Sequence, residues 1–360
     1  MNKILGGVIL FLSLFGFDAV PVSASDEHGE KQAEFNPGEM IIDHISDSHD
    51  WHLFGHVTVP LPVIIYQPGN GLHVFSSSRF EHGTASYEGF KLEKNKIVAE
   101  DGSDLYDISI TKNAASLLFV IVLMLIVFTS VAKRYGNSKN AAPKGLQSWL
   151  EPIIVFIRDE VAKSSIGEKK YEKYMPFLLT VFFFILFLNL LGLVPIIPGG
   201  ANVTGNIAIT MSLALLTFII TTISANKNYW HHIFAMPGVP VWVLFLLTPI
   251  EILGMFLRPF VLMIRLFANI MAGHIIALSF FSLIFIFGKL NMWAGYGTSV
   301  VSVAFTIFMT LLELLVAFLQ AYVFTLLSAI YFGAAVEEHA SHEHPPHADA
   351  NDHIEQAAIV

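Results

Sequence analysis

The stretch PFVLMIRLFANIMAG, residues Pro259 to Gly273, sets an arginine inside an apolar run that extends from about Val241 to Phe287. A guanidinium cannot lose its proton to escape a low-dielectric environment. Leaving it at the centre of a bilayer costs between ~3 and ~17 kcal/mol, depending on the reference system. The stretch contains no acidic residue that could compensate Arg265. The sequence therefore predicts that a carboxylate or a water-filled cavity from elsewhere faces Arg265, and it marks this arginine as a functional residue.

The composition indicates a membrane protein. Of the 360 residues, 54% are hydrophobic and 14% are charged, and the apolar residues gather in long runs, which excludes an ordinary soluble domain. The net charge of -9 comes largely from a polar amino-terminal region and a His-, Asp- and Glu-rich tail, so it says little about the membrane core or about nucleic acid. No nucleic-acid partner is expected. The chain has no cysteine, which excludes disulfides, thiol nucleophiles and cysteine-bound clusters.

The amino terminus has the pattern of a signal peptide, residues 1–24. Lys3 is followed by an apolar run from Ile4 to Phe17 and by small residues that suit cleavage after Ala24. The alternative is an uncleaved anchor, which is disfavoured because the run is shorter than the ~20 residues that a spanning helix needs. Cleavage would leave the mature amino terminus outside the cytoplasmic membrane.

Residues 25–112 are polar, with Gly and Asn turns between short β-rich pieces at 56–66, 72–75 and 108–111. This pattern predicts a small, mostly β extramembrane region. Histidines and aspartates gather between His28 and His56 and could bind a metal, but they lack a regular ligand spacing. A solvated, partly disordered segment is the favoured interpretation of that opening part, and no metal site is predicted.

Five apolar segments predict five membrane helices, at about 114–132, 175–194, 202–224, 241–287 and 299–336. Lys133 and Arg134 follow the first segment directly, so the positive-inside rule places that end in the cytoplasm. Residues 145–166 mix apolar and charged positions, which predicts an amphipathic helix along the cytoplasmic face. Five crossings from an outside start put the carboxyl terminus in the cytoplasm, and the tail at 337–360 is expected to be a solvated low-complexity end.

The last two segments are longer than a perpendicular span requires. Residues 241–287 would extend roughly 70 Å as one helix, about twice the hydrocarbon thickness. They must tilt, lie partly in the membrane plane or break, and Pro249 and Pro259 offer two break points. We expect two long, tilted, antiparallel helices joined by a short loop, Lys289 to Gly297. The predicted fold class is an all-α polytopic membrane protein, with its membrane domain at 113–336.

Polar residues are few in these two segments, and they fall into a pattern. On the second segment, Glu313, Gln320 and Tyr331 lie within about 20° of one another at 100° per residue, so they form a polar stripe. Each polar residue has a purely structural interpretation: Arg258, for example, could satisfy carbonyls freed at Pro259. Taken together, the intramembrane bases and acids favour an ion pathway. The ionisable residues are Glu251, Arg258, Arg265, His274 and Glu313.

Two motifs carry a family resemblance. RLFANIMAGH, from Arg265 to His274, resembles the signature R-L-F-x-N-x-x-A-G of the a subunit of F-type ATP synthases. LQAYVFTLLSAIY, from Leu319 to Tyr331, is similar to that family's last membrane helix. Ser130 to Lys133 and Asn189 to Pro195 also match, so the similarity covers about residues 108–338. The long amino-terminal region departs from the short family minimum.

The resemblance implies a proton-translocating stator subunit that couples the proton motive force to rotation and ATP synthesis. It implies c-ring rotor subunits, b-type peripheral-stalk subunits and the lipid bilayer of a bacterial inner membrane as partners. Neither a catalytic site of its own nor a cofactor is expected, and the chain shows no phosphate-binding loop of the Walker type.

The resemblance also implies residue roles. Arg265 would face the rotor carboxylates, with His274 and Glu313 in an outer aqueous half-channel and Glu251 near the exit of an inner one. The family often has an acid and a histidine at the positions of His274 and Glu313, and the pair is preserved in kind here. The implied proton-translocation residues are Arg265, Glu251, Asn269, His274, Glu313, Gln320 and Tyr331.

Other function classes stay open. A secondary transporter with its own substrate site would predict internal repeats and matching broken helices, and no convincing repeat is visible. A purely structural scaffold would leave the intramembrane charges unexplained. A sodium-driven variant would have the same architecture as a proton-driven one.

Overall fold

The computed structural model describes residues 36–54, 57–93, 95–137, 144–194, 199–236, 238–290 and 292–337. The predicted signal peptide, the turn at 195–198 and the tail beyond residue 337 lie outside the described residues. All elements below belong to one unit that begins at Pro37. Within the described residues, five helices are long and apolar enough to cross a membrane, which confirms the predicted all-α polytopic class.

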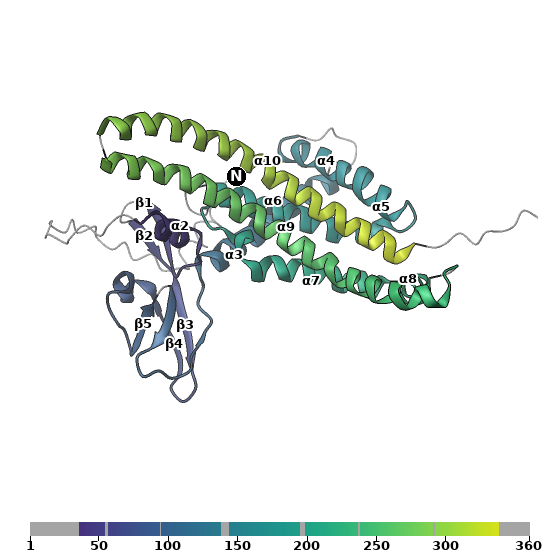
Figure 1. Cartoon of the computed structure of the whole chain (residues 1–360), viewed down its shortest axis with the longest axis horizontal. Helices are drawn as coiled ribbons and strands as arrows, with labels where there is room; N and C mark the ends of the chain where they lie inside the picture. The colour runs from purple at the N-terminus through teal and green to yellow at the C-terminus, as the bar shows by residue number, and fades with distance from the viewer. Residues whose placement is uncertain are drawn as a thin grey trace, which may run out of the picture. The chain divides into compact units, whose positions relative to one another are not determined.

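The five membrane helices are α3 (Lys112–Asn137), α6 (Tyr171–Leu193), α7 (Ile207–Ser224), α9 (Val241–Leu290) and α10 (Met292–Val336). Helices α9 and α10 run side by side as the predicted hairpin (Figure 1). Helix α9 continues through Pro249 and Pro259, so neither proline breaks it. The predicted loop from Lys289 to Gly297 is wrong in extent, because only residue 291 separates the two helices.

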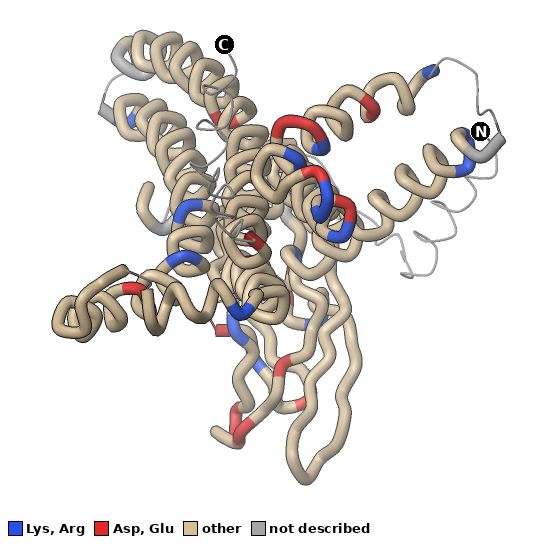
Figure 2. The backbone as a smooth tube through the Cα atoms, turned by 90° about the vertical axis from the view of Figure 1, so that its right-hand side faces the viewer, with Lys and Arg blue, Asp and Glu red and all other residues tan. Residues whose placement is uncertain are grey.

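The predicted amphipathic helix begins as α4 (Leu146–Phe156) and continues through π-helical turns (Ile157–Lys163) into α5 (Ser164–Ile166). Ile157 is fully buried, whereas Trp149 is 77% exposed, so one face packs and the other is open. Helix α10 passes so close to α5 that a Cβ on Gly333 would collide with the carbonyl oxygen of Ser165. Figure 2 shows acidic and basic residues on this segment beside long uncharged stretches of helix.

The buried core of the helical part lies where α10 meets α6, α9 and the π-helical turns. Its largest fully buried side chains include Phe182, Phe183, Leu266 and Phe332. Close van der Waals packing holds membrane helices together because lipid is as apolar as the side chains themselves. Two short elements complete this part, the 3-10 turn η3 (Val203–Gly205) and helix α8 (Lys227–Phe234).

The amino-terminal region contains helix α2 (Pro37–Ile45) and small antiparallel sheets. In the first sheet, β1 (Asp50–Phe54) pairs with β2 (Val57–Pro60). The second sheet has the order β4-β3-β7 and contains β3 (Pro62–Gln67), β4 (Gly71–Ser76) and β7 (Tyr106–Asp107). In the third, β5 (Phe90–Glu93) pairs with β6 (Lys96–Ala99), and the 3-10 turn η1 (Ser77–Gly83) follows β4. Buried Val63 and Ile65 alternate with outward residues on β3 and pack in one cluster with Phe80 and Phe90.

The β-containing region is therefore confirmed, with two corrections. Helix α2 and strand β1 occupy part of the segment that the sequence predicts to be partly disordered, because contacts with the membrane helices order it. Residues 108–111 form no strand, because β7 ends at Asp107, although the backbone N–H groups of Ile108 and Ile110 still donate to the carbonyls of Ile64 and Pro62. Among the described residues, no group of three His, Cys, Asp or Glu side chains could hold a metal ion.

Candidate functional site

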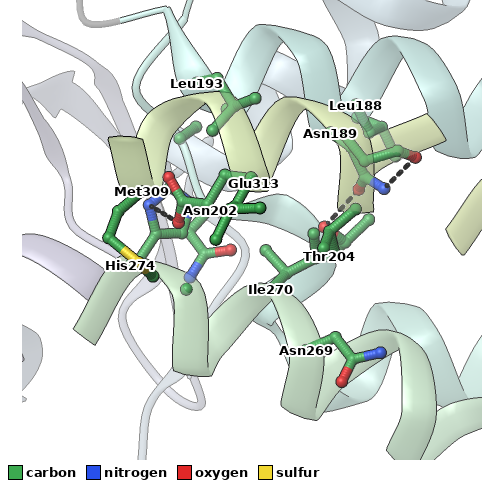
Figure 3. Close-up of a pocket in the computed structure, with 16 residues that line it drawn as sticks. Leu188, Asn189, Leu193, Asn202, Thr204, Asn269, Ile270, His274, Met309 and Glu313 are labelled. Carbon is green, nitrogen blue, oxygen red and sulfur yellow. Dashed lines mark hydrogen bonds and ion pairs between the residues drawn. The ribbon is translucent and has the colours of Figure 1, made fainter. Parts of the chain in front are cut away.

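Helices α9 and α10 bring His274 and Glu313 together. Their side chains point toward one another (Figure 3), and His274 Nδ1 lies 3.7 Å from Glu313 Oε1. Both side chains are largely buried, at 18% and 13% exposed. Gly273 makes room for the carboxylate, because a Cβ there would lie 2.5 Å from Glu313 Oε1. A small residue thus lets an acid and an imidazole meet across two helices.

A cavity of about 170 Å³ lies beside this pair. A buried water needs roughly 10–15 Å³ of such space and at least two polar partners, so the cavity has room for several waters. Water, imidazole and carboxyl groups all donate and accept protons. The lining comprises Leu188, Asn189, Gly192, Leu193, Ala201, Asn202, Thr204, Asn269, Ile270, Gly273, His274, Met309, Leu312, Glu313, Val316 and Ala317.

Asn189, Asn202 and Thr204 line the cavity, although the sequence did not single them out as site residues. The Thr204 hydroxyl donates to Asn189 Oδ1 at 2.8 Å, and Asn189 Nδ2 donates to the carbonyl of Ala317 at 3.3 Å. The signal for Asn189 was available, because it is an amide inside an otherwise apolar span. Asn202 and Thr204 precede α7 in a turn whose packing no sequence pattern reveals.

Arg265 lies nine positions before His274, or ~13 Å along α9 at 1.5 Å per residue. Its side chain is exposed, and it makes no hydrogen bond or ion pair with any residue that the structure describes. The next residue, Leu266, is 1% exposed, so α9 turns its apolar face into the bundle and Arg265 away from it. Asn269, one turn farther on, is exposed as well and forms part of the cavity lining.

A second polar cluster lies on the other side of Arg265 and centres on Arg258. Its Nη1 donates to the hydroxyl of Tyr229 at 3.5 Å, and its guanidinium carbon lies 5.8 Å from the ring centre of Tyr331. The adjoining cavity is only about 10 Å³, with Thr217 and Thr221 of α7 among its lining residues. Arg258 therefore links α8, α9 and α10 through aromatic side chains.

The structure separates the remaining predicted site residues. Gln320 is buried on α10, between Glu313 and Tyr331 along the helix, and Tyr331 is half-buried in the second cluster. Glu251 is partly exposed and forms no ion pair with the described part of the chain. The predicted set thus divides into a cavity with a carboxyl and an imidazole, a tight aromatic cluster, and an arginine between them.

Comparison with known proteins identifies the family. The family model described as ATP synthase A chain matches residues 115–333, and a second model, described only as a domain of unknown function, matches residues 40–117. "ATP synthase subunit a" of Chlorobium phaeobacteroides (strain BS1) is 40% identical over 347 residues, which cover 93% of this chain and 94% of the relative.

Two further relatives agree. "ATP synthase subunit a 2" of Chlorobaculum tepidum is 46% identical, covering 90% of this chain and 81% of its own length. "ATP synthase subunit a" of Myxococcus xanthus is 42% identical over 69% of this chain and 78% of its own length. With a matching family model over most of the membrane helices and relatives of this similarity over nearly the whole chain, the protein belongs to the ATP synthase A chain family.

Proposed function

We propose that this chain is the proton-translocating stator subunit of an F-type ATP synthase. Two offset aqueous half-channels pass protons to and from carboxylates on a ring of rotor subunits, and Arg265 separates the two. The observation that carries the proposal is the exposed guanidinium of Arg265, which makes no hydrogen bond or ion pair with the described residues and is set between two polar clusters.

A fixed positive charge performs two tasks at such a place. It favours the ionised form of an approaching carboxylate, which promotes release of its proton. It also repels a hydronium ion that would otherwise pass straight from one half-channel to the other. Lysine could become neutral when desolvated, whereas arginine keeps its charge. Arg265 is exposed on α9, where a passing carboxylate from another subunit has access to it.

The outer half-channel uses the cavity around His274 and Glu313. Protons enter it from the side of the amino-terminal region during synthesis and pass by water and these two groups toward Asn269 and the rotor. The separation of 3.7 Å between Nδ1 and Oε1 is too long for a direct hydrogen bond, and a small rotation or one water molecule would join the two groups. Asn189 and Thr204, which are hydrogen-bonded to each other, add polar groups to the cavity wall.

The inner half-channel leads past Gln320 and Tyr331 toward Glu251 on the cytoplasmic side. The cavity of about 10 Å³ at Arg258 and Tyr331 has room for one water at most. This route therefore depends on side chains and on the surface that α9 and α10 share with the rotor.

The orientation follows from the positive-inside rule. Arg134 lies in the last turn of α3, and Lys170 and Lys173 flank the start of α6, so these ends face the cytoplasm and residues 25–112 lie outside. The mature chain would have its amino terminus outside a bacterial inner membrane and its carboxyl tail, 337–360, in the cytoplasm. Its partners are c-ring subunits, b-type peripheral-stalk subunits and lipid, and ATP is made on other subunits of the complex.

Purification of the intact complex tests this function. A stator subunit copurifies with a ring of small helical-hairpin subunits, and proteoliposomes containing the complex pump protons on addition of ATP without added sodium. A protein that purifies without such a ring would support a secondary transporter instead. So would uptake of a solute that needs neither a ring nor ATP. Pumping that requires sodium would identify the sodium-driven variant.

A further inference from the structure

The amino-terminal region contacts the wall of the His274–Glu313 cavity. The indole Nε1 of Trp51, on β1, donates to the carbonyl of Gly199 at 3.0 Å, in the segment that joins α6 to α7. Trp51 is 7% exposed and packs in one apolar cluster with Leu188 and Ala201. Both of these residues also line the cavity, so one side of its wall rests on the extramembrane region.

Helix α2 packs against α9, and the first residues of α3 tie it in place. Lys112, the first residue of α3, is 8% exposed, and its Nζ donates to the carbonyl of His44 at 3.4 Å. The carboxylate of Asp47 accepts the backbone N–H of Asn113 at 3.1 Å. This contact satisfies one of the free donors at the amino end of α3.

These contacts hold two basic residues, His44 and Lys112, next to each other where α2 packs against α9. Glu313 approaches His274 from α10. Apolar residues form much of the remaining lining. The amino-terminal region thus covers one side of the cavity wall, and its helix α2 lies against the helix that carries His274.

We propose that residues 37–112 form the rim of the outer proton entrance, with His44 and Lys112 at its mouth. This inference rests on the proposed function and extends it, because it makes the extramembrane region part of the ion path. The region is where the family model of unknown function matches. Its sheet then serves to hold α2 and Trp51 against the membrane helices.

Cysteine labelling tests this placement, because the chain has no cysteine of its own. His44 is exposed on α2, so His44→Cys leaves the packed core intact. Ser86→Cys is the matched control, since Ser86 is also exposed but lies between η1 and β5. The intact complex is reconstituted in proteoliposomes with this region facing the bath, and a membrane-impermeant, positively charged thiosulfonate is added from that side. A complex with the unaltered chain receives the same treatment, which accounts for cysteines on other subunits.

We expect labelling of His44→Cys to lower ATP synthesis driven by an imposed proton gradient at least fivefold, and a thiol reductant to restore it. Complete labelling of Ser86→Cys should change the rate less than twofold. Complete labelling of His44→Cys with an unchanged rate of ATP synthesis would overturn the proposal that residues 37–112 form the rim of the proton entrance. Each rate is compared with that of the same complex before labelling, and ATP synthesis by the unlabelled Ser86→Cys complex supports the proposed function whether or not labelling at residue 44 overturns the rim.

Discussion

The two polar clusters on either side of Arg265 differ in size and in chemistry. The cavity at His274 and Glu313 measures about 170 Å³ and holds a carboxyl and an imidazole, whereas the one at Arg258 and Tyr331 measures about 10 Å³ and is lined by phenols and hydroxyls. Water can occupy the first but hardly the second. On the proposed function, this chain alone builds most of one half-channel, while the other needs a surface supplied by the rotor.

At the larger cavity, the largest effect should come from substitutions of His274 and Glu313 themselves. His274→Ala and Glu313→Ala should each lower ATP-driven proton pumping more than tenfold, because each removes a group that relays protons. Exchanging the two residues, His274→Glu with Glu313→His, should retain more pumping than either alanine variant, since one acid and one base remain in the same cavity. Fluorescence quenching in inverted vesicles measures all three. Equal loss in the three variants would argue against a shared channel.

A smaller effect should follow when the cavity wall loses a hydroxyl. Thr204→Val removes the donor to Asn189 Oδ1 and leaves a buried amide oxygen less well satisfied, which costs about 1–3 kcal/mol. We expect a two- to fivefold loss of pumping and a lower melting temperature of the complex. Thr210→Val is the control, because Thr210 is fully buried on α7 but bonds only carbonyls of its own helix and lies outside the cavity. Equal pumping losses in both would show that the wall hydroxyl has no special role.

In the second cluster, around Arg258 and Tyr331, a single substitution should lower proton pumping less. Arg258→Lys keeps the charge but loses the planar group that lies over Tyr331, an interaction worth about 0.5–2 kcal/mol. We expect pumping to fall by no more than threefold, with Tyr229→Phe weaker still because it removes only a hydroxyl. A loss as large as that of Glu313→Ala would mean that Arg258 takes part in proton transfer.

The smallest effect is expected outside both clusters, at Asp159. Hydrogen bonds from Arg158 and Lys163 lower the pKa of Asp159 below its usual range. A lowered pKa gives stability that is present above the unfolded-state value and is lost only as pH falls through the folded-state value. Because the three groups lie at the surface, Asp159→Asn should leave pumping unchanged between pH 6 and 8, about the range of the assay. A changed pH profile in that range would connect the π-helical turns, Ile157–Lys163, to the ion path.

The sequence predicts the site better than it predicts its surroundings. Arg265, His274 and Glu313 stand out because a charge in an apolar segment is costly, and helical periodicity relates residues on one helix. Periodicity cannot show which residues of α6 and η3 approach them, so Asn202 and Thr204 were missed. Helix α2 was missed because contacts with α9 order it, and local pattern does not encode such contacts.

The prolines of α9 are a case in which a local sequence signal predicts a break that the structure does not have. Pro249 and Pro259 each remove a backbone donor and indicate break points, yet the helix continues through both. In a membrane, neighbouring helices and side chains can satisfy the freed carbonyls, so local propensity is a weaker guide there than in water.

The separation of the two clusters by Arg265 is tested most directly with Arg265→Ala in inverted vesicles. Two quantities are measured: ATP-driven proton pumping and passive proton flow through the complex under an imposed potential. Arg79→Ala serves as the control, because Arg79 is an exposed arginine of the amino-terminal region. We predict that Arg265→Ala assembles, loses ATP-driven pumping and leaks protons faster than the unaltered complex. Normal coupled pumping by Arg265→Ala would contradict the account.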